Sequence, residues 1–173
     1  MVDPAILRLV AITDDALDRR NMLIERASAA VRGGATCIQL RLKNAQPREV
    51  VDVARALVAA VSVPVIVNDR ADIALVAGAA GVHVGDTDLP VVAIRRFAPE
   101  GFVIGASLGS DRELENASDA DYVGIGPLFS SGSKTDAGEA IGIEGFKRLA
   151  ALCGLPAIAI GGITPERVPQ IME

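Results

Sequence analysis

Short runs of apolar residues alternate along this chain with segments in which apolar residues recur at helical spacing. Alternation of this kind is typical of parallel strands that are covered by helices. The pattern predicts strands at residues 10–13, 36–40, 64–68, 81–84, 102–106, 122–126 and 156–160, and helices at about 21–32, 71–78, 90–97, 111–118, 143–152 and 165–172.

A further helix is predicted between the second and third strands. One of its faces is apolar and the opposite face is charged, as in a helix that covers a sheet. The apolar positions are Val50, Val53, Ala54, Leu57 and Val61, and the charged positions are Arg48, Glu49, Asp52 and Arg55.

Very short strands, followed almost every time by glycine-rich segments, favour a closed barrel over an open doubly wound sheet. We therefore predict a single α/β domain of the (β/α)8 TIM-barrel class over residues 1–173, with seven βα units. The carboxyl ends of barrel strands meet at one face, where the active site is built. Polar residues that close the strands are the first candidates for function.

Composition narrows the range of functions. No apolar run approaches the roughly 20 residues of a membrane helix, and no signal peptide is recognisable, so a cytoplasmic protein is expected. A net charge of -5 and an aromatic content of 3% argue against a nucleic-acid partner. The two cysteines, Cys37 and Cys153, are expected to be reduced and packed. A single histidine excludes a histidine-rich metal site and most catalytic triads.

The second strand ends in QLRLK, which supplies the first group of candidates. Arg41 and Lys43 alternate with Gln39, so the three side chains should leave the strand on the same side. A guanidinium and an ammonium group beside an amide can bind phosphate oxygens. A solvated strand end is the alternative for a single arginine, and the neighbouring cation makes that alternative less favourable.

Two aspartates follow neighbouring strands. Asp69 lies in VNDRAD and Asp88 in GDTDLP, so the two carboxylates can face one small volume. Oxygen ligands from few protein residues suit Mg²⁺, which keeps several waters and is completed by substrate phosphates. The alternative is that Asp88, or Asp86, caps the helix that follows.

Two further connections could contact an anion. Residues 126–142 form the longest connection without a predicted element, rich in glycine and hydroxyl groups and with one lysine, Lys134; a solvated loop is the alternative. Gly161 and Gly162 form a strand-to-helix turn, a common seat for phosphate in barrels. His83 should lie in or near the barrel interior, and no catalytic role is assigned to it.

Six motifs in order, QLRLK, NDR, GVHVGDTDLP, GASL, GPLFSSGSK and AIGGIT, resemble thiamine-phosphate synthase from about residue 8 to 172. The resemblance implies a transferase that couples hydroxymethylpyrimidine pyrophosphate to a carboxylated thiazole phosphate and releases pyrophosphate and carbon dioxide, in thiamine biosynthesis. Its partners would be these small-molecule substrates, with no nucleic acid or membrane, and a homo-oligomer is left open.

The same resemblance implies a set of site residues. Mg²⁺ would be the cofactor, held by Asp69 and Asp88. Arg41, Lys43 and Lys134 would be catalytic, because they can stabilise the charge on the departing pyrophosphate while the electron-rich pyrimidine stabilises the carbocation. The substrate-binding residues would be Gln39, Leu40, Arg41, Leu42, Lys43, Asn68, Ser107, Ser131, Gly132, Ser133, Lys134 and Gly162.

Three features depart from the family pattern. Leu42 stands where an acidic residue is frequent, and Asp86 stands where an amide is common. The chain also stops at Glu173, before the family's eighth strand and last helix, so we expect a truncated barrel of low stability. The alternatives are a non-catalytic remnant that still binds pyrophosphate, or a thiazole tautomerase. The tautomerase is less favoured, because it relies on a histidine after the fifth strand, where this chain reads GASLGSD.

Overall fold

Seven strands form one parallel sheet in the computed structural model, which describes residues 2–13, 20–130 and 139–172. Their order in the sheet is their order in the sequence, and each lies within about two residues of its predicted bounds. The strands are β1 (Val10–Ile12), β2 (Cys37–Leu40), β3 (Val65–Asn68), β4 (Gly81–Val84), β5 (Val103–Leu108), β6 (Tyr122–Ile125) and β7 (Ala157–Ala159).

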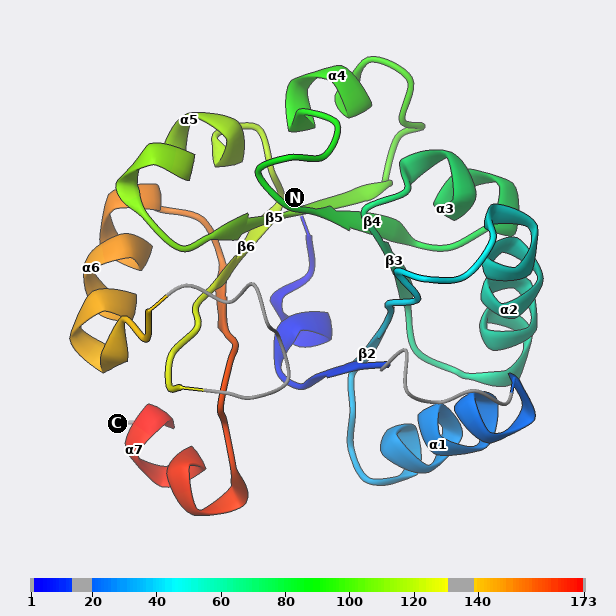
Figure 1. The fold of residues 1–173 in the computed structure, drawn as a ribbon, viewed down its shortest axis with the longest axis horizontal. Helices are drawn as coiled ribbons and strands as arrows, with labels where there is room; N and C mark the ends of the chain where they lie inside the picture. The colour runs from blue at the N-terminus through cyan, green and yellow to red at the C-terminus, as the bar shows by residue number, and fades with distance from the viewer. Residues whose placement is uncertain (1, 14–19, 131–138, 173) are drawn as a thin grey trace.

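Helices follow the strands and surround the sheet. Figure 1 shows α1 to α6 on the outside of the curled sheet, with η1 inside the ring that they form. The helices are η1 (Pro4–Leu7), α1 (Arg20–Arg32), α2 (Pro47–Ala60), α3 (Ala71–Ala77), α4 (Val91–Arg95), η2 (Asp111–Glu113), α5 (Leu114–Ala117), α6 (Gly142–Cys153), η3 (Pro165–Arg167) and α7 (Val168–Met172).

The predicted α/β class is confirmed. The described strands form a curled sheet with two edges and not a closed ring. Among the described residues, β1 and β7 are those edges and are not paired with each other. All recorded strand pairs are parallel and join neighbours in sequence. The carboxyl ends of the strands therefore lie along one rim of the curl, which we call the carboxyl rim.

The larger core lies between the outer face of the sheet and the helices. Ile38 and Leu40 of β2 and their counterparts in the other strands point outward into it, because side chains alternate along a strand. The predicted apolar face of α2 packs against this core, with Val50, Val53, Ala54 and Leu57 buried. The four residues of β2 are all buried, as expected for a parallel strand covered on both faces.

A smaller core fills the inside of the curl near the strand starts. Val2 and Leu7, from the segment around η1, pack there against Cys37, Ile66 and Tyr122. Burial raises the pKa of Cys37 to about 12, so the thiol stays protonated and packs as a small apolar group, as predicted. This N-terminal plug was not predicted from the sequence.

No helix of the described chain is both long and apolar enough to cross a membrane.

Candidate active site

The predicted side-chain alternation continues past the end of β2. The strand ends at Leu40, but the next residues keep alternating between its two sides. Leu42 packs against the outer core. The charges of Arg41 and Lys43 act instead on the carboxylate of Asp69. Thr13 fastens this segment, because its hydroxyl accepts a hydrogen bond from the Arg41 amide at 2.8 Å and donates one to the Arg41 carbonyl at 3.2 Å. Both cations therefore lie on the same side as Asp69.

Two leucines of the predicted substrate-binding set point away from this cluster. Leu40 is fully buried in the outer core, and Leu42 is partly buried against it. Neither side chain is therefore available to a ligand at the carboxyl rim, since both are used for packing.

An amide pair lies on the inner face of the sheet. Gln39 is 4% exposed, and its Nε2 donates to Oδ1 of Asn68 at 2.8 Å. The two residues belong to neighbouring strands, and the hydrogen bond fixes the orientation of both amides. Gln39 and Asn68 are thus brought together as the sequence predicted.

Asp69 has an unusual backbone conformation. Its φ of 65° is the only positive value at a non-glycine residue in the described part of the chain. Its amide donates to the carbonyl of His83 at 2.7 Å, which continues the pairing of β3 with β4 for one residue beyond the strand. Aspartate tolerates this left-handed region better than most residues, and such conformations cluster at functional sites.

The carboxyl groups of Asp69 and Asp88 lie in direct contact. The pKa of Asp69 is raised to about 6, first by burial and then by the charge of Asp88 and a hydrogen bond between the two side chains. Lys43 and Arg41 lower the same pKa, so all four charged groups share one electrostatic environment. The sequence predicted both the pair of aspartates and its basic neighbours.

The helix-capping alternative for Asp88 is not what the structure shows. The N-cap position of α4 is Pro90, and the Val91 amide at the start of the helix donates to Oδ1 of Asn116 at 3.4 Å. One carboxylate oxygen of Asp88 instead accepts the Gly85 amide at 2.7 Å, which closes the loop after β4. Asp86 is exposed and does not cap α4 either.

The chemistry of this aspartate pair fits a hard divalent cation. Two carboxyl groups that share a hydrogen bond in a partly buried site hold a proton below about pH 6, and above that pH a cation could bind in its place. In the described chain, no group of three or more histidine, cysteine or acidic side chains lies together. A site with two protein ligands suits Mg²⁺, whose other positions are taken by water and substrate oxygens.

Ser107 lies near the end of β5, next to the one histidine of the chain. Its Oγ is 3.1 Å from Nε2 of His83, and Nδ1 of His83 is 3.0 Å from the hydroxyl of Tyr122. His83 lines the inside of the curl, as predicted. Tyr122 was missed by the sequence reasoning, although the glycines at 105 and 124 signal a close approach of side chains inside the sheet.

The turn after β7 carries Gly162, with a φ of 65°. A Cβ there would lie 2.7 Å from the carbonyl oxygen of Phe129, so the turn packs directly on the loop after β6. Arg167 holds the two segments: its Nη1 donates to the Gly162 carbonyl at 2.6 Å, and its guanidinium lies 4.5 Å from the centre of the Phe129 ring. Arg167 was not predicted as a site residue. Ser131, Gly132, Ser133 and Lys134 lie outside the described residues.

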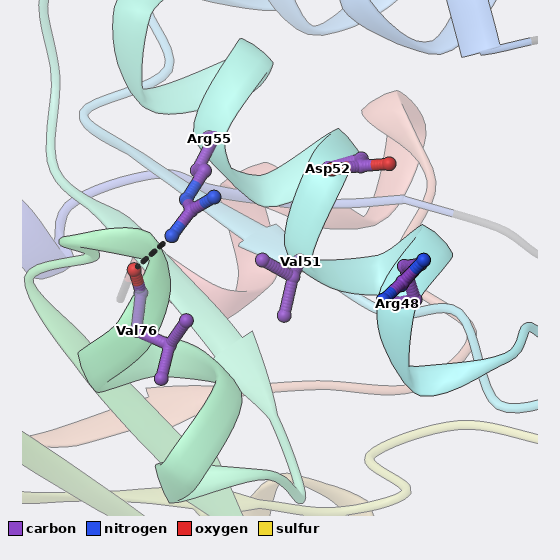
Figure 2. Close-up of a pocket in the computed structure, with 5 residues that line it drawn as sticks. All are labelled: Arg48, Val51, Asp52, Arg55 and Val76. Atoms are coloured by element: carbon purple, nitrogen blue, oxygen red, sulfur yellow. Dashed lines mark hydrogen bonds between the residues drawn. The ribbon is translucent and has the colours of Figure 1, made fainter.

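An open hollow on the outer helices is separate from the predicted site. It has a volume of about 430 Å³ and lies along α2 and α3, where Arg55 donates to the carbonyl of Val76 at 3.3 Å (Figure 2). None of its lining residues belongs to the predicted site. They are Arg48, Val51, Asp52, Arg55 and Val76.

A family model, curated relatives and one solved structure of more than 30% identity indicate the same family. The family model described as thiamine monophosphate synthase matches residues 9–173. A thiamine-phosphate synthase of Azorhizobium caulinodans is 42% identical over 100% of this chain and 84% of its own length. One from Methanoculleus marisnigri is also 42% identical, over 95% of this chain and 80% of its own. A solved structure, thiamine phosphate pyrophosphorylase from Pyrococcus furiosus, matches with a TM-score of 0.83 and 34% identity, covering 98% of this chain and 82% of its own.

Proposed function

The chain belongs to the thiamine monophosphate synthase family, and on that premise we propose how its residues perform the reaction. It is a transferase of the thiamine-phosphate synthase type. The reaction couples hydroxymethylpyrimidine pyrophosphate with a thiazole phosphate and releases pyrophosphate. The curated relatives support this activity over a non-catalytic remnant or a thiazole tautomerase.

The contact between Asp69 and Asp88, with Arg41 and Lys43 acting on it, is the observation that supports our assignment of the site. We propose that the two aspartates hold Mg²⁺ and that the two cations bind the pyrophosphate group. Mg²⁺ supplies positive charge to the phosphate oxygens when bound. Positive charges beside a departing pyrophosphate stabilise the negative charge that develops on it. They therefore lower the activation barrier for its separation from the pyrimidine carbon.

The remaining residues bind and orient. The fixed amides of Gln39 and Asn68 present hydrogen-bonding groups close to the same cluster. The Gly162 turn, which packs against the loop after β6, would offer backbone amides to the thiazole phosphate. We also propose that Lys134 stabilises the charge on the departing pyrophosphate, and that Ser131, Gly132 and Ser133 bind substrate.

Three broader expectations also stay proposals. An eighth strand between β1 and β7 would pair with both edges and complete the predicted barrel, and in-frame reading of the DNA that follows codon 173 would test it. A cytoplasmic location and a homo-oligomer likewise remain predictions.

The metal assignment is tested by calorimetric titration of the pyrimidine pyrophosphate with and without Mg²⁺. We expect tight binding only with the metal, and we expect Asp69→Asn to weaken the metal dependence by about tenfold or more, as loss of one of two protein ligands should. Asp86→Asn is the matched control, because Asp86 is an exposed carboxylate in the same loop as Asp88. Equal affinity with and without Mg²⁺ would remove the metal assignment.

A further inference from the structure

A row of three residues crosses the inside of the curl. His83 pairs in register with Gly105, and Gly105 pairs with Tyr122, so a glycine separates the two rings. A Cβ on Gly105 would lie 2.2 Å from the Tyr122 ring, and one on Gly124 would lie 3.0 Å from Cε1 of His83. The two glycines therefore leave the space in which the imidazole and phenol meet.

Tyr122, His83 and Ser107 form a continuous chain of hydrogen bonds that ends at the carboxyl rim. The Tyr122 hydroxyl is 3.0 Å from Nδ1 of His83, and Nε2 of His83 is 3.1 Å from Oγ of Ser107. Tyr122 is fully buried and His83 is 8% exposed, whereas Ser107 is half-buried at the carboxyl end of β5. The chain thus connects a buried phenol to a hydroxyl group at the candidate site.

The direction of these hydrogen bonds follows from the phenol. Within the described residues, the imidazole is the recorded hydrogen-bond partner of the Tyr122 hydroxyl. If Nδ1 carried a proton, it would donate to that oxygen, and the phenol hydrogen would be buried without an acceptor, which is costly. The same objection applies to the doubly protonated ring. The arrangement that satisfies every group has Tyr122 donating to Nδ1, which leaves the imidazole proton on Nε2.

The Nε2–H group then donates to Oγ of Ser107. One lone pair of the serine Oγ accepts this hydrogen bond. The hydrogen of the serine hydroxyl therefore turns away from the imidazole and toward the carboxyl rim. Phosphate oxygens are acceptors only, so a serine that binds them must donate. We propose that Tyr122 fixes His83 as the neutral Nε2–H tautomer, and that His83 is a positioning residue that holds Ser107 as a hydrogen-bond donor to the pyrophosphate group.

The tautomer can be measured directly because the chain has one histidine. In the ¹⁵N-labelled 173-residue protein without substrate, a two-dimensional ¹⁵N–¹H spectrum of the imidazole at about pH 7.5 should show a protonated Nε2 and an unprotonated Nδ1. Tyr122→Phe removes the donor to Nδ1 and should shift the population toward the other tautomer. A protonated Nδ1 in the unaltered protein would overturn the proposal.

The effect on the ligand is tested by calorimetry with pyrimidine pyrophosphate and Mg²⁺, and this half rests on the proposed function. Tyr122→Phe should raise the Kd about fivefold, the loss expected for one oriented hydrogen bond, without changing the Kd for thiazole phosphate. In a Ser107→Ala background the same substitution should have no further effect. An equal loss in that background would show that Tyr122 does not act through Ser107, and would overturn the positioning role.

The two arms separate the possible failures. If the unaltered chain binds no pyrimidine pyrophosphate, the proposed function and the donor role of Ser107 both fail, while the spectrum still decides the tautomer. If binding is normal but the tautomer is Nδ1–H, the function stands and the positioning role fails.

Discussion

At the scale of single residues, Asp69 combines two unfavourable features. Its backbone lies in the left-handed region, and its carboxyl group is partly buried beside that of Asp88. Each feature costs free energy, so their combination indicates a position chosen for chemistry rather than for stability. The nearby Arg41 and Lys43 offset part of the electrostatic cost, since both lower the pKa of Asp69.

A pH dependence of stability follows from the raised pKa of Asp69. Its pKa is about 6 in the folded protein and 3.8 in an unperturbed aspartate, so the folded state binds this proton more tightly. The resulting stabilisation is complete below about pH 3.8 and is lost as the pH rises through about 6. In the variant Asp69→Asn, the amide side chain does not ionise. In the presence of EDTA, this variant should melt a few degrees above the unaltered protein at about pH 7.5, and the two should converge near pH 4.

The control for this experiment is Asp86→Asn, since Asp86 is an exposed carboxylate with no part in the contact. Its melting temperature should follow that of the unaltered protein at both pH values. Identical melting of Asp69→Asn and the unaltered protein at about pH 7.5 would show that the folded protein does not disfavour the Asp69 carboxylate.

At the scale of elements, the sequence predicted most of the fold. The strands were found because a buried parallel strand is a short, nearly continuous apolar run, and α2 because its apolar positions follow the helical period. The shorter outer helices were less well bounded: the segment predicted at 90–97 is helical only over Val91–Arg95. Local sequence gives weak information on where such short helices begin and end.

Contacts across the sheet could be predicted only between neighbouring strands. The Gln39–Asn68 and Asp69–Asp88 contacts join neighbouring strands, so the order of the motifs was sufficient. The His83–Tyr122 contact spans two strand pairs and depends on register, which the sequence does not specify. Arg167 lies in η3 and contacts the preceding turn and the loop after β6, an arrangement that only the folded chain defines.

The contact of η3 with these two segments predicts a selective effect on one substrate. Arg167→Ala removes the hydrogen bond to the Gly162 carbonyl and the stacking on Phe129, so the turn should lose its fixed position. We expect the Kd for thiazole phosphate to rise about five- to tenfold, with little change for pyrimidine pyrophosphate. Calorimetric titration of both ligands measures this.

Arg148→Ala provides the comparison, because Arg148 also makes a two-pronged contact, with Asp111, but on an exposed surface. It should leave both affinities unchanged. Equal losses for the two ligands in Arg167→Ala would indicate general loosening of the fold instead of a role in the Gly162 turn.

At the scale of the whole molecule, the sheet is most strongly held at its middle. The central strands β3, β4 and β5 each have a partner on both sides, whereas β1 and β7 each have one among the described strands. The edges are also short, at three residues each, and β7 is only half-buried. Local stability should therefore fall from the centre of the sheet toward its edges.

Hydrogen exchange of the 173-residue chain tests this gradient. Amides of β4, such as that of Val82, should exchange last and at the rate of global unfolding, while amides of β1 and β7 should exchange first, through local opening. Mass spectrometry of peptides after timed labelling resolves the strands. Uniform protection from β1 to β7 would mean that both edges are held by contacts beyond those described here.

The position of the N-terminal plug determines how the protein is oriented when it is immobilised on a surface. Val2 and Leu7 fill the inside of the curl near the strand starts. Thr36, the residue before β2, holds this segment, because its hydroxyl donates to the Ile6 carbonyl at 3.0 Å. A linker placed ahead of the plug should therefore leave the molecule at the end opposite the carboxyl rim. Molecules immobilised on a surface through that linker would all present the rim to the solution, an orientation suited to sensors and flow reactors.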